Sequence, residues 1–188
     1  MGRAYKNFWS LNTDEAVVAG ILRSETNKSI EVLMPLNAQM KDVDLVLLNT
    51  KSKKSLTIQV KGSRAFEPRK NETREYLYGS AGWFFFPREV ISKSTADWFT
   101  FLIYVIEQHP KEGRRLIEPH VITIPTDKLK KLVDKYKKVG KTGRYNFLLW
   151  VDPKRKIAFD FHDKKYILSD FLDKNGFKKL NGALLSRP

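Results

Sequence analysis

Three polar residues, Asp44, Gln59 and Lys61, have the types and the spacing that metal-assisted hydrolysis requires. Gln59 and Lys61 belong to the apolar run SLTIQVKGS, and side chains two positions apart lie on the same face of a strand. Asp44 opens the preceding apolar run, VDLVLLN. If the two runs pair through the intervening loop, Asp44 lies near the other two residues. The sequence therefore predicts an acid, an amide oxygen and an ammonium group at one edge of a sheet.

This grouping has a chemical use, because hard divalent cations prefer oxygen ligands. The Asp44 carboxylate, the Gln59 amide oxygen and the backbone carbonyl of Val60 are the expected ligands. A cation held there would polarise a phosphodiester and lower the pKa of a bound water. Lys61 would orient that water or stabilise the negative charge that develops during hydrolysis.

Each of these residues also has a simpler interpretation. Asp44 could end a turn before a strand, and Asp42 is an equally placed rival. Lys61 could be a solvated charge that protects an edge strand from pairing. Gln59 is flanked by apolar residues, so if it is buried it needs a partner, which favours a site or a polar network.

One helix and three strands must position this group. The helical spacing of apolar residues predicts a helix over residues 13–24. Short β-branched runs bounded by turn-forming residues predict strands over 30–36, 43–49 and 55–63. The polar segment 64–75 is expected to be an exposed loop.

The rest of the chain continues in the same way. Further elements are expected as strands over 83–86, 97–106 and 119–124, a helix over 127–138 capped by Thr126, a hairpin over 144–151 and 156–161, and a short helix with a tail over 168–185. No linker, repeat or low-complexity tract is visible in the 188 residues. We therefore expect one α/β domain over residues 1–188, with a motif core over about 12–63 and a basic part over about 126–188.

The ordered set of a helix, a strand, an Asp-bearing strand and a QVK strand resembles the core of the PD-(D/E)XK, or restriction-endonuclease-like, nuclease superfamily. In that family an Asp begins the second core strand, a (D/E/Q)xK triplet lies in the third, and a Glu on the preceding helix often completes the metal site. Matched position by position, the resemblance assigns these places to Asp44, to Gln59 with Lys61, and to Glu15. It extends over residues 12–63, about one third of the chain.

The resemblance implies a restriction-endonuclease-like α/β fold, in which a central mixed sheet is flanked by helices. It also implies a Mg²⁺- or Mn²⁺-dependent endonuclease that hydrolyses DNA phosphodiester bonds, with Asp44, Gln59, Lys61 and Glu15 as its catalytic residues. The metal ligands would be Asp44, Gln59, the Val60 carbonyl and Glu15. Glu15 also fits a capping box with Asn12, in which its carboxylate bonds back to the backbone N–H of the capping residue.

One departure from the family pattern matters. Gln59 supplies a neutral oxygen where most active members of the superfamily supply a carboxylate. The lower negative charge predicts weaker metal binding. It leaves open a second function, that of a catalytically inactive nuclease-fold protein that binds DNA or RNA without cutting it.

The charge of the chain indicates nucleic acid as its partner. Lys and Arg number 35 against 21 Asp and Glu, which gives a formal net charge of +14 and a pI near 9.9. From Thr126 onward 17 Lys and Arg stand against 7 Asp, which accounts for +10 of that total. A small domain with this excess usually binds polyphosphate. DNA is the expected partner, ahead of RNA, an acidic protein or a membrane surface.

Two groups of residues are the candidates for contacts with phosphates. They are Ser63, Arg64, Arg69, Lys70 and Arg74 after the QVK strand, and Lys130, Lys131, Lys137 and Lys138 on the polar face of the helix over 127–138. An ordinary charged loop and a solvated helix face are the simpler interpretations of the same residues.

Several classes of protein are disfavoured. The chain has no Cys, which excludes a disulfide scaffold, a cysteine zinc site, an iron–sulfur cluster and thiol catalysis. Signatures of serine hydrolases and of nucleotide binding are absent. The first residues lack an apolar signal region and no apolar stretch is long enough to cross a bilayer, so a cytoplasmic protein is expected. A homodimer through the aromatic strands after Trp83 would present two sites to a duplex.

Overall fold

Two five-stranded sheets form the centre of the protein, of which a computed structural model describes residues 13–35, 42–63, 65–66, 79–108, 115–135 and 143–185. The first sheet contains, in spatial order, β1 (Ile30–Leu33), β2 (Leu45–Asn49), β3 (Ser55–Gly62), β6 (Trp98–Gln108) and β7 (Arg115–Pro125). The second contains β10 (Asp163–Ile167), β9 (Ile157–Asp160), β8 (Arg144–Asp152), β5 (Ser80–Pro87) and β4 (Ala65–Phe66). The helices are α1 (Thr13–Glu25), α2 (Glu89–Ser92), α3 (Thr126–Lys135) and α4 (Asp173–Leu185), with a short 3-10 turn, η1 (Ser169–Phe171), before α4.

The first sheet is mixed. β1, β2 and β3 form an antiparallel meander in which Leu45 pairs with Ile58, and β6 then joins β3 in parallel, with Gln59 opposite Phe99. Parallel neighbours need a crossover connection, and here the chain between β3 and β6 contains β4, β5 and α2. The crossover therefore passes through the second sheet before the chain returns to the first.

An aromatic core fills the space between the two sheets. Phe99 and Phe101 of β6 pack in one cluster with Phe84 of β5 and Phe147 of β8, and all four side chains are at most 3% exposed. The rings of Phe84 and Phe101 meet edge to face with their centroids 5.0 Å apart, a favoured geometry for aromatic pairs. Burial of this apolar surface is the main force that holds the sheets together.

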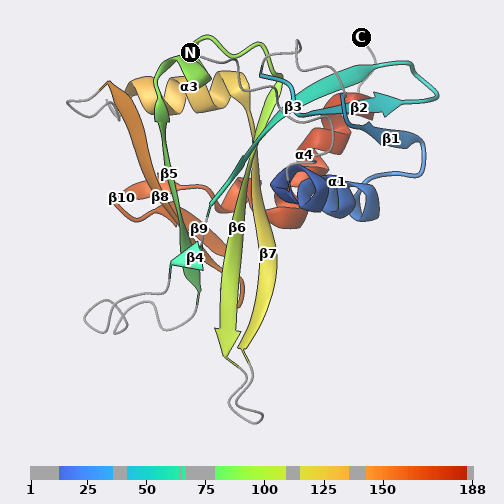
Figure 1. The fold of residues 1–188 in the computed structure, drawn as a ribbon. Helices are drawn as coiled ribbons and strands as arrows, with labels where there is room; N and C mark the ends of the chain where they lie inside the picture. The colour runs from blue at the N-terminus through green and yellow to red at the C-terminus, as the bar shows by residue number, and fades with distance from the viewer. Residues whose placement is uncertain are drawn as a thin grey trace, which may run out of the picture.

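Two helices cover the other face of the first sheet. Figure 1 shows α1 and α4 on one side of β6 and β7 and the strands of the second sheet on the other. Val18 and Leu22 of α1 and Leu180 of α4 form one buried cluster with Leu45 and Ile58. α3 instead packs its apolar face onto the aromatic core. None of the helices in the described part of the chain is both long and apolar enough to cross a membrane.

The elements that carry the motif are confirmed. The helix predicted over 13–24 is α1, and the strands predicted over 43–49 and 55–63 are β2 and β3, joined as the predicted hairpin. The strand predicted over 30–36 is shorter, because β1 ends at Leu33. The later strands and the hairpin of β8 and β9 are also present. The structure is therefore mixed α/β, as the sequence predicted.

Other elements differ from the sequence prediction. A strand, β10, occupies 163–167, where none was predicted, and two residues of the predicted exposed loop form β4. The short helix and tail expected over 168–185 are wrong, because α4 alone has 13 residues. Two glycines weaken its local helical signal, but Phe177, Leu180 and Leu184 are buried, and tertiary packing outweighs local propensity.

Candidate functional site

The Asp44 carboxylate binds the backbone of β3 just before β2 begins. Asp44 donates its N–H to the Ile58 carbonyl at 2.9 Å, and its Oδ2 accepts the Val60 N–H at 2.7 Å. The side chain thus takes the place of a strand partner beyond the end of the β2–β3 ladder. Asp44 therefore lies across from the Gln59 end of β3, as the sequence predicted.

The Gln59 side chain is buried in a polar network. It is 4% exposed, its Nε2 donates to Asp42 Oδ1 at 3.5 Å, and its Oε1 accepts the Ser94 hydroxyl at 3.3 Å. The Ser94 oxygen in turn accepts the Ala96 N–H at 3.2 Å. Because both ends of the amide are bonded, Gln59 meets the requirement for a buried polar group. Its oxygen faces Ser94 and its nitrogen faces Asp42.

Asp42, the rival to Asp44, also contacts β3. Its φ is 69°, a left-handed conformation that Asp tolerates better than most residues. With this backbone its carboxylate reaches the Gln59 amide, while Asp44 reaches the neighbouring Val60 N–H. The sequence left the choice between the two acids open. In the structure both contact β3, Asp42 at Gln59 and Asp44 at Val60.

Lys61 lies on the same side of β3 as Gln59. It is half-buried and it lines a groove of about 480 Å³, together with Gly62 and residues 83–86 of β5. Ser63, the first residue after β3, is fixed to β5. Its Oγ accepts the Trp83 N–H at 2.7 Å and donates to the Trp83 carbonyl at 2.9 Å. The end of β3 that carries the predicted lysine is thereby joined to the second sheet.

The first turn of α1 brings a carboxylate against β3 and β6. Asp14 Oδ1 accepts the Tyr104 hydroxyl at 3.3 Å, and a Cβ added to Gly62 would overlap the Asp14 carboxyl group. Burial of Tyr104 and the neighbouring Asp14 carboxylate both raise the pKa of Tyr104 above its ordinary value. Glu15, the predicted helix ligand, follows in the same turn and is half-buried. Its role at a metal stays a prediction.

Asp97 fixes the position of β3 relative to β6. Its Oδ2 accepts both the N–H and the hydroxyl of Thr57 at 2.8 Å, and its own N–H donates to the Thr57 hydroxyl at 2.9 Å. Thr57 lies two residues before Gln59, so these bonds align the start of β6 with the motif strand. Their strength comes partly from the carboxylate charge.

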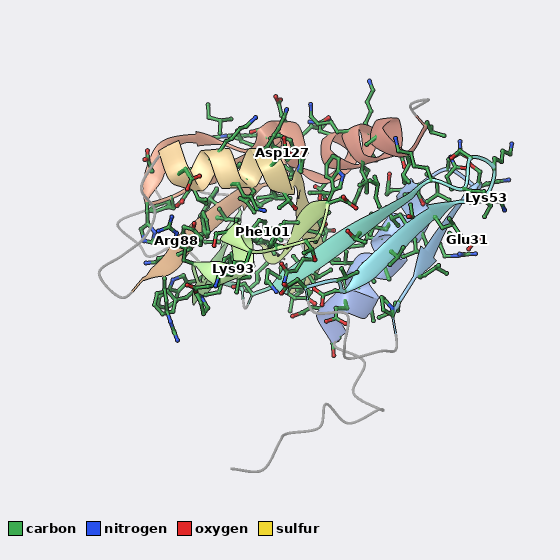
Figure 2. The ribbon with its side chains drawn as sticks, turned by 90° about the horizontal axis from the view of Figure 1, so that it is seen from above. Glu31, Lys53, Arg88, Lys93, Phe101 and Asp127 are labelled. Atoms are coloured by element: carbon green, nitrogen blue, oxygen red, sulfur yellow. The ribbon has the colours of Figure 1, made fainter. Side chains whose placement is uncertain are left out.

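The predicted phosphate contacts have different surroundings. Lys130 is half-buried and donates to the Ser94 carbonyl at 3.1 Å, which places it beside the Gln59 network, whereas Lys131 is exposed. Arg64, Arg69, Lys70, Arg74, Lys137 and Lys138 lie outside the described residues. Figure 2 shows Arg88 and Lys93 on the side of Phe101 away from Lys53, which lies in the β2–β3 turn.

The donor chemistry at β3 fits a hard divalent cation. Asp42 and Asp44 bring two carboxylates to residues 59 and 60, and Mg²⁺ or Mn²⁺ prefers such oxygen ligands. Gln59 would have to turn its amide over to offer its oxygen on this side. No group of three or more His, Asp or Glu side chains that could hold a metal is found in the described ranges. A site here would thus rely on backbone or amide oxygens besides the two carboxylates.

Comparisons of the chain with protein-family models, with curated proteins and with solved structures found no match. The likeness of residues 12–63 to the nuclease superfamily therefore rests on the motif and on the order of the elements.

Several residues of the site carry no signal in the sequence. Ser94 lies 35 positions from its partner Gln59, and Asp14 lies 90 positions from Tyr104, so neither contact could be predicted from local spacing. The exposed aromatic side chains of β5 could have been found. Strict alternation along WFFF places two of its four aromatic residues on the outer face of a strand.

Proposed function

We propose that the protein is a metal-dependent DNA endonuclease with a restriction-endonuclease-like fold. The observation that carries this proposal is the placement of Asp44 at Val60, with Asp42 at Gln59 and Lys61 two residues along the strand. The order of the elements supports it, because α1 comes first, β2 begins directly after Asp44, and β3 carries the QVK triplet.

The side chains divide the work of hydrolysis. Bound Mg²⁺ or Mn²⁺ would supply charge to polarise a phosphodiester and to activate a water. Asp44 and the Val60 carbonyl would hold it, with Asp42 and Gln59 as the further ligands. The Lys61 ammonium, on the same side of β3 as Gln59, would orient the attacking water or stabilise the charge on the phosphate.

A second function, DNA or RNA binding without cleavage, is favoured by one observation. The Gln59 oxygen, which the motif would offer to a metal, instead accepts the Ser94 hydroxyl. A nuclease fold that keeps the basic surface but holds its amide in this way would bind polyphosphate through charge alone.

Cleavage separates the two functions. Supercoiled plasmid, linear duplex, single strands and branched junctions are incubated with Mg²⁺ or Mn²⁺, and with EDTA as the metal-free control. We expect cleavage that depends on the metal, and a loss of about 100-fold or more in the Lys61→Ala variant, because the lysine acts on the reacting group.

Lys51→Ala is the matched control for Lys61→Ala. Lys51 is exposed in the turn at the opposite end of the β2–β3 hairpin from Asp44, so its removal should leave the rate unchanged. Absence of cutting on every substrate, or equal cutting by Lys61→Ala and Lys51→Ala, contradicts the nuclease proposal. Salt-sensitive binding without cleavage would establish the second function.

The partners follow from the same proposal. DNA is the proposed ligand, with RNA second, and a homodimer would present two sites to the two strands of a duplex. The cytoplasmic location expected from the sequence stays a prediction.

A further inference from the structure

Two large aromatic side chains of β5 lie on the outer face of the second sheet. Side chains alternate along the strand, and Phe84 and Phe86 are buried in the aromatic core at 3% and 9% exposure. Trp83 and Phe85 are 51% and 48% exposed. Exposed aromatic residues in neighbouring positions are unusual on a soluble surface and often mark a binding site.

The Trp83 ring is held in one orientation. Its Nε1–H donates to Asn146 Oδ1 at 2.6 Å, and its backbone N–H and carbonyl both bond to the Ser63 hydroxyl. The polar edge of the indole is satisfied while about half of the residue stays exposed. A partner that stacks on such a ring loses little side-chain entropy, because the ring is already fixed.

Positive charge accompanies these rings. The Arg144 guanidinium lies 5.1 Å from the centroid of the Phe85 ring, and Lys61 lines the groove of about 480 Å³ that runs beside residues 83–86. Among the described residues that line this groove, none is an acid. Arg88 follows β5 directly, and its N–H donates to the Gly143 carbonyl at 3.2 Å, next to Arg144. Aromatic faces beside cations favour an anionic partner with flat rings.

We propose that this groove binds unpaired bases of single-stranded DNA. The bases would stack on Trp83 and Phe85, and the phosphates would lie against Arg144 and Lys61. The choice of DNA rests on the proposed function, and Lys61 connects the groove to the proposed site. It follows that the preferred substrate contains a single-stranded segment, such as a flap, a gap or a junction.

The spacing of the two rings favours an unpaired strand over a duplex. Positions two apart in a strand are separated by about 7 Å along its axis. Stacked nucleotides of one strand in a DNA duplex lie about 3.4 Å apart. Adjacent bases can therefore occupy both rings only when they are unstacked from each other, as in a single strand.

Binding of a fluorescent oligo-dT and of a duplex of equal length is measured in EDTA, where a metal-dependent enzyme cannot cut. We expect Trp83→Ala and Phe85→Ala each to weaken oligo-dT binding by about 5- to 150-fold, with a much smaller effect on the duplex. Trp83→Phe keeps a ring for stacking and should keep most of the affinity. Ile117→Ala, which removes an exposed apolar side chain from β7, is the matched control.

Two results would overturn the proposal that this groove binds single-stranded DNA. One is unchanged oligo-dT affinity in a folded Trp83→Ala, Phe85→Ala double variant, with thermal unfolding as the check on folding. The other is a change from dimer to monomer in sedimentation without any change in oligo-dT binding, which would make this face a protein interface. If single-strand binding needs the two rings but the protein cuts no substrate, the binding role of the groove is supported and the nuclease proposal is contradicted.

Discussion

At the scale of single residues, the two ends of the Gln59 amide determine what a substitution there does. Its nitrogen donates to Asp42 and its oxygen accepts Ser94, so the side chain is neutral, buried and satisfied. A carboxylate at the same position would lie close to Asp42 without an intervening donor. Like charges at this separation repel unless a cation lies between them.

Gln59→Glu should therefore make the stability of the protein depend on metal. Without metal we expect a lower midpoint of thermal unfolding, because two carboxylates approach each other in a buried place. Mn²⁺ should raise the midpoint of this variant more than that of the wild type. The double variant with Asp42→Asn relieves the repulsion and serves as the control. An Mn²⁺ effect no larger on Gln59→Glu than on the wild type would show that residue 59 does not face a metal.

The raised pKa of Tyr104 predicts that the protein loses stability at high pH. Burial, and then the Asp14 carboxylate, raise its pKa in the folded state. Below about pH 10 the hydroxyl is protonated in both states and contributes no pH dependence. Above it the unfolded chain ionises first and holds fewer protons, so the free energy of unfolding falls. In urea titrations at about pH 8 and about pH 11, Tyr104→Phe should lose less stability than the wild type, and an equal loss would contradict this assignment.

Some contacts of the site could be predicted from the sequence and others could not. Asp44 directly precedes β2 and Gln59 lies on β3, its partner in the hairpin, so alternation and loop length were enough to predict that they are neighbours. Ser94 and Asp14 approach β3 from a crossover and from a helix, and long-range packing places them. No local pattern encodes that packing.

At the scale of elements, α1 can lie close to β3 because Gly62 has no side chain. The Asp14 carboxyl group occupies the space that a Cβ would take. This close approach brings the first turn of α1, with Asp14 and Glu15, to the strand that carries the motif. Helix and strand therefore meet near the proposed site and not only through their apolar faces.

Gly62→Ala should destabilise the protein by about 1–3 kcal/mol, because the new methyl group forces the Asp14 side chain or the helix to move. Asp14→Ala should relieve part of the cost, so the two substitutions together should cost less than their sum. Gly182→Ala in α4 meets nothing within 4 Å and should stabilise by about 0.5–1 kcal/mol. Urea unfolding measures the free energy of unfolding of the three single variants and of the double variant. Additive costs for Gly62→Ala and Asp14→Ala would refute the contact between Gly62 and Asp14.

The elements also show what the sequence could predict. The β2–β3 hairpin was predictable, because two apolar runs flank a polar turn. β10 was not, because DKKYI has few apolar residues and its pairing with β9 is irregular. The parallel pairing of β3 with β6 was not predictable either. It joins residues about 40 positions apart through a crossover that visits another sheet.

At the scale of the whole molecule, the net charge of +14 predicts that DNA binding is sensitive to salt. Each phosphate contact releases counterions, so the logarithm of the binding constant should fall linearly with the logarithm of the salt concentration. We expect a slope of about −4 or steeper for duplex DNA. Lys131→Ala, at an exposed position of α3, should make the slope shallower by about 1 if this lysine contacts a phosphate. A slope near zero would exclude binding through the charged surface.

A single substitution at Asp44 tests whether this site cleaves DNA with a bound metal. Asp44→Asn keeps an oxygen that can accept the Val60 N–H but removes the charge that would hold a metal. The matched control is Glu31→Gln on β1, which Figure 2 shows at the same end of the molecule as Lys53. The measurement is the initial rate of DNA cleavage in saturating Mg²⁺. The wild type and Glu31→Gln should cut at equal rates, and Asp44→Asn should cut at least about 100-fold more slowly. Equal cleavage by Asp44→Asn, or no cleavage by the wild type, would rule out metal-dependent cleavage at Asp44.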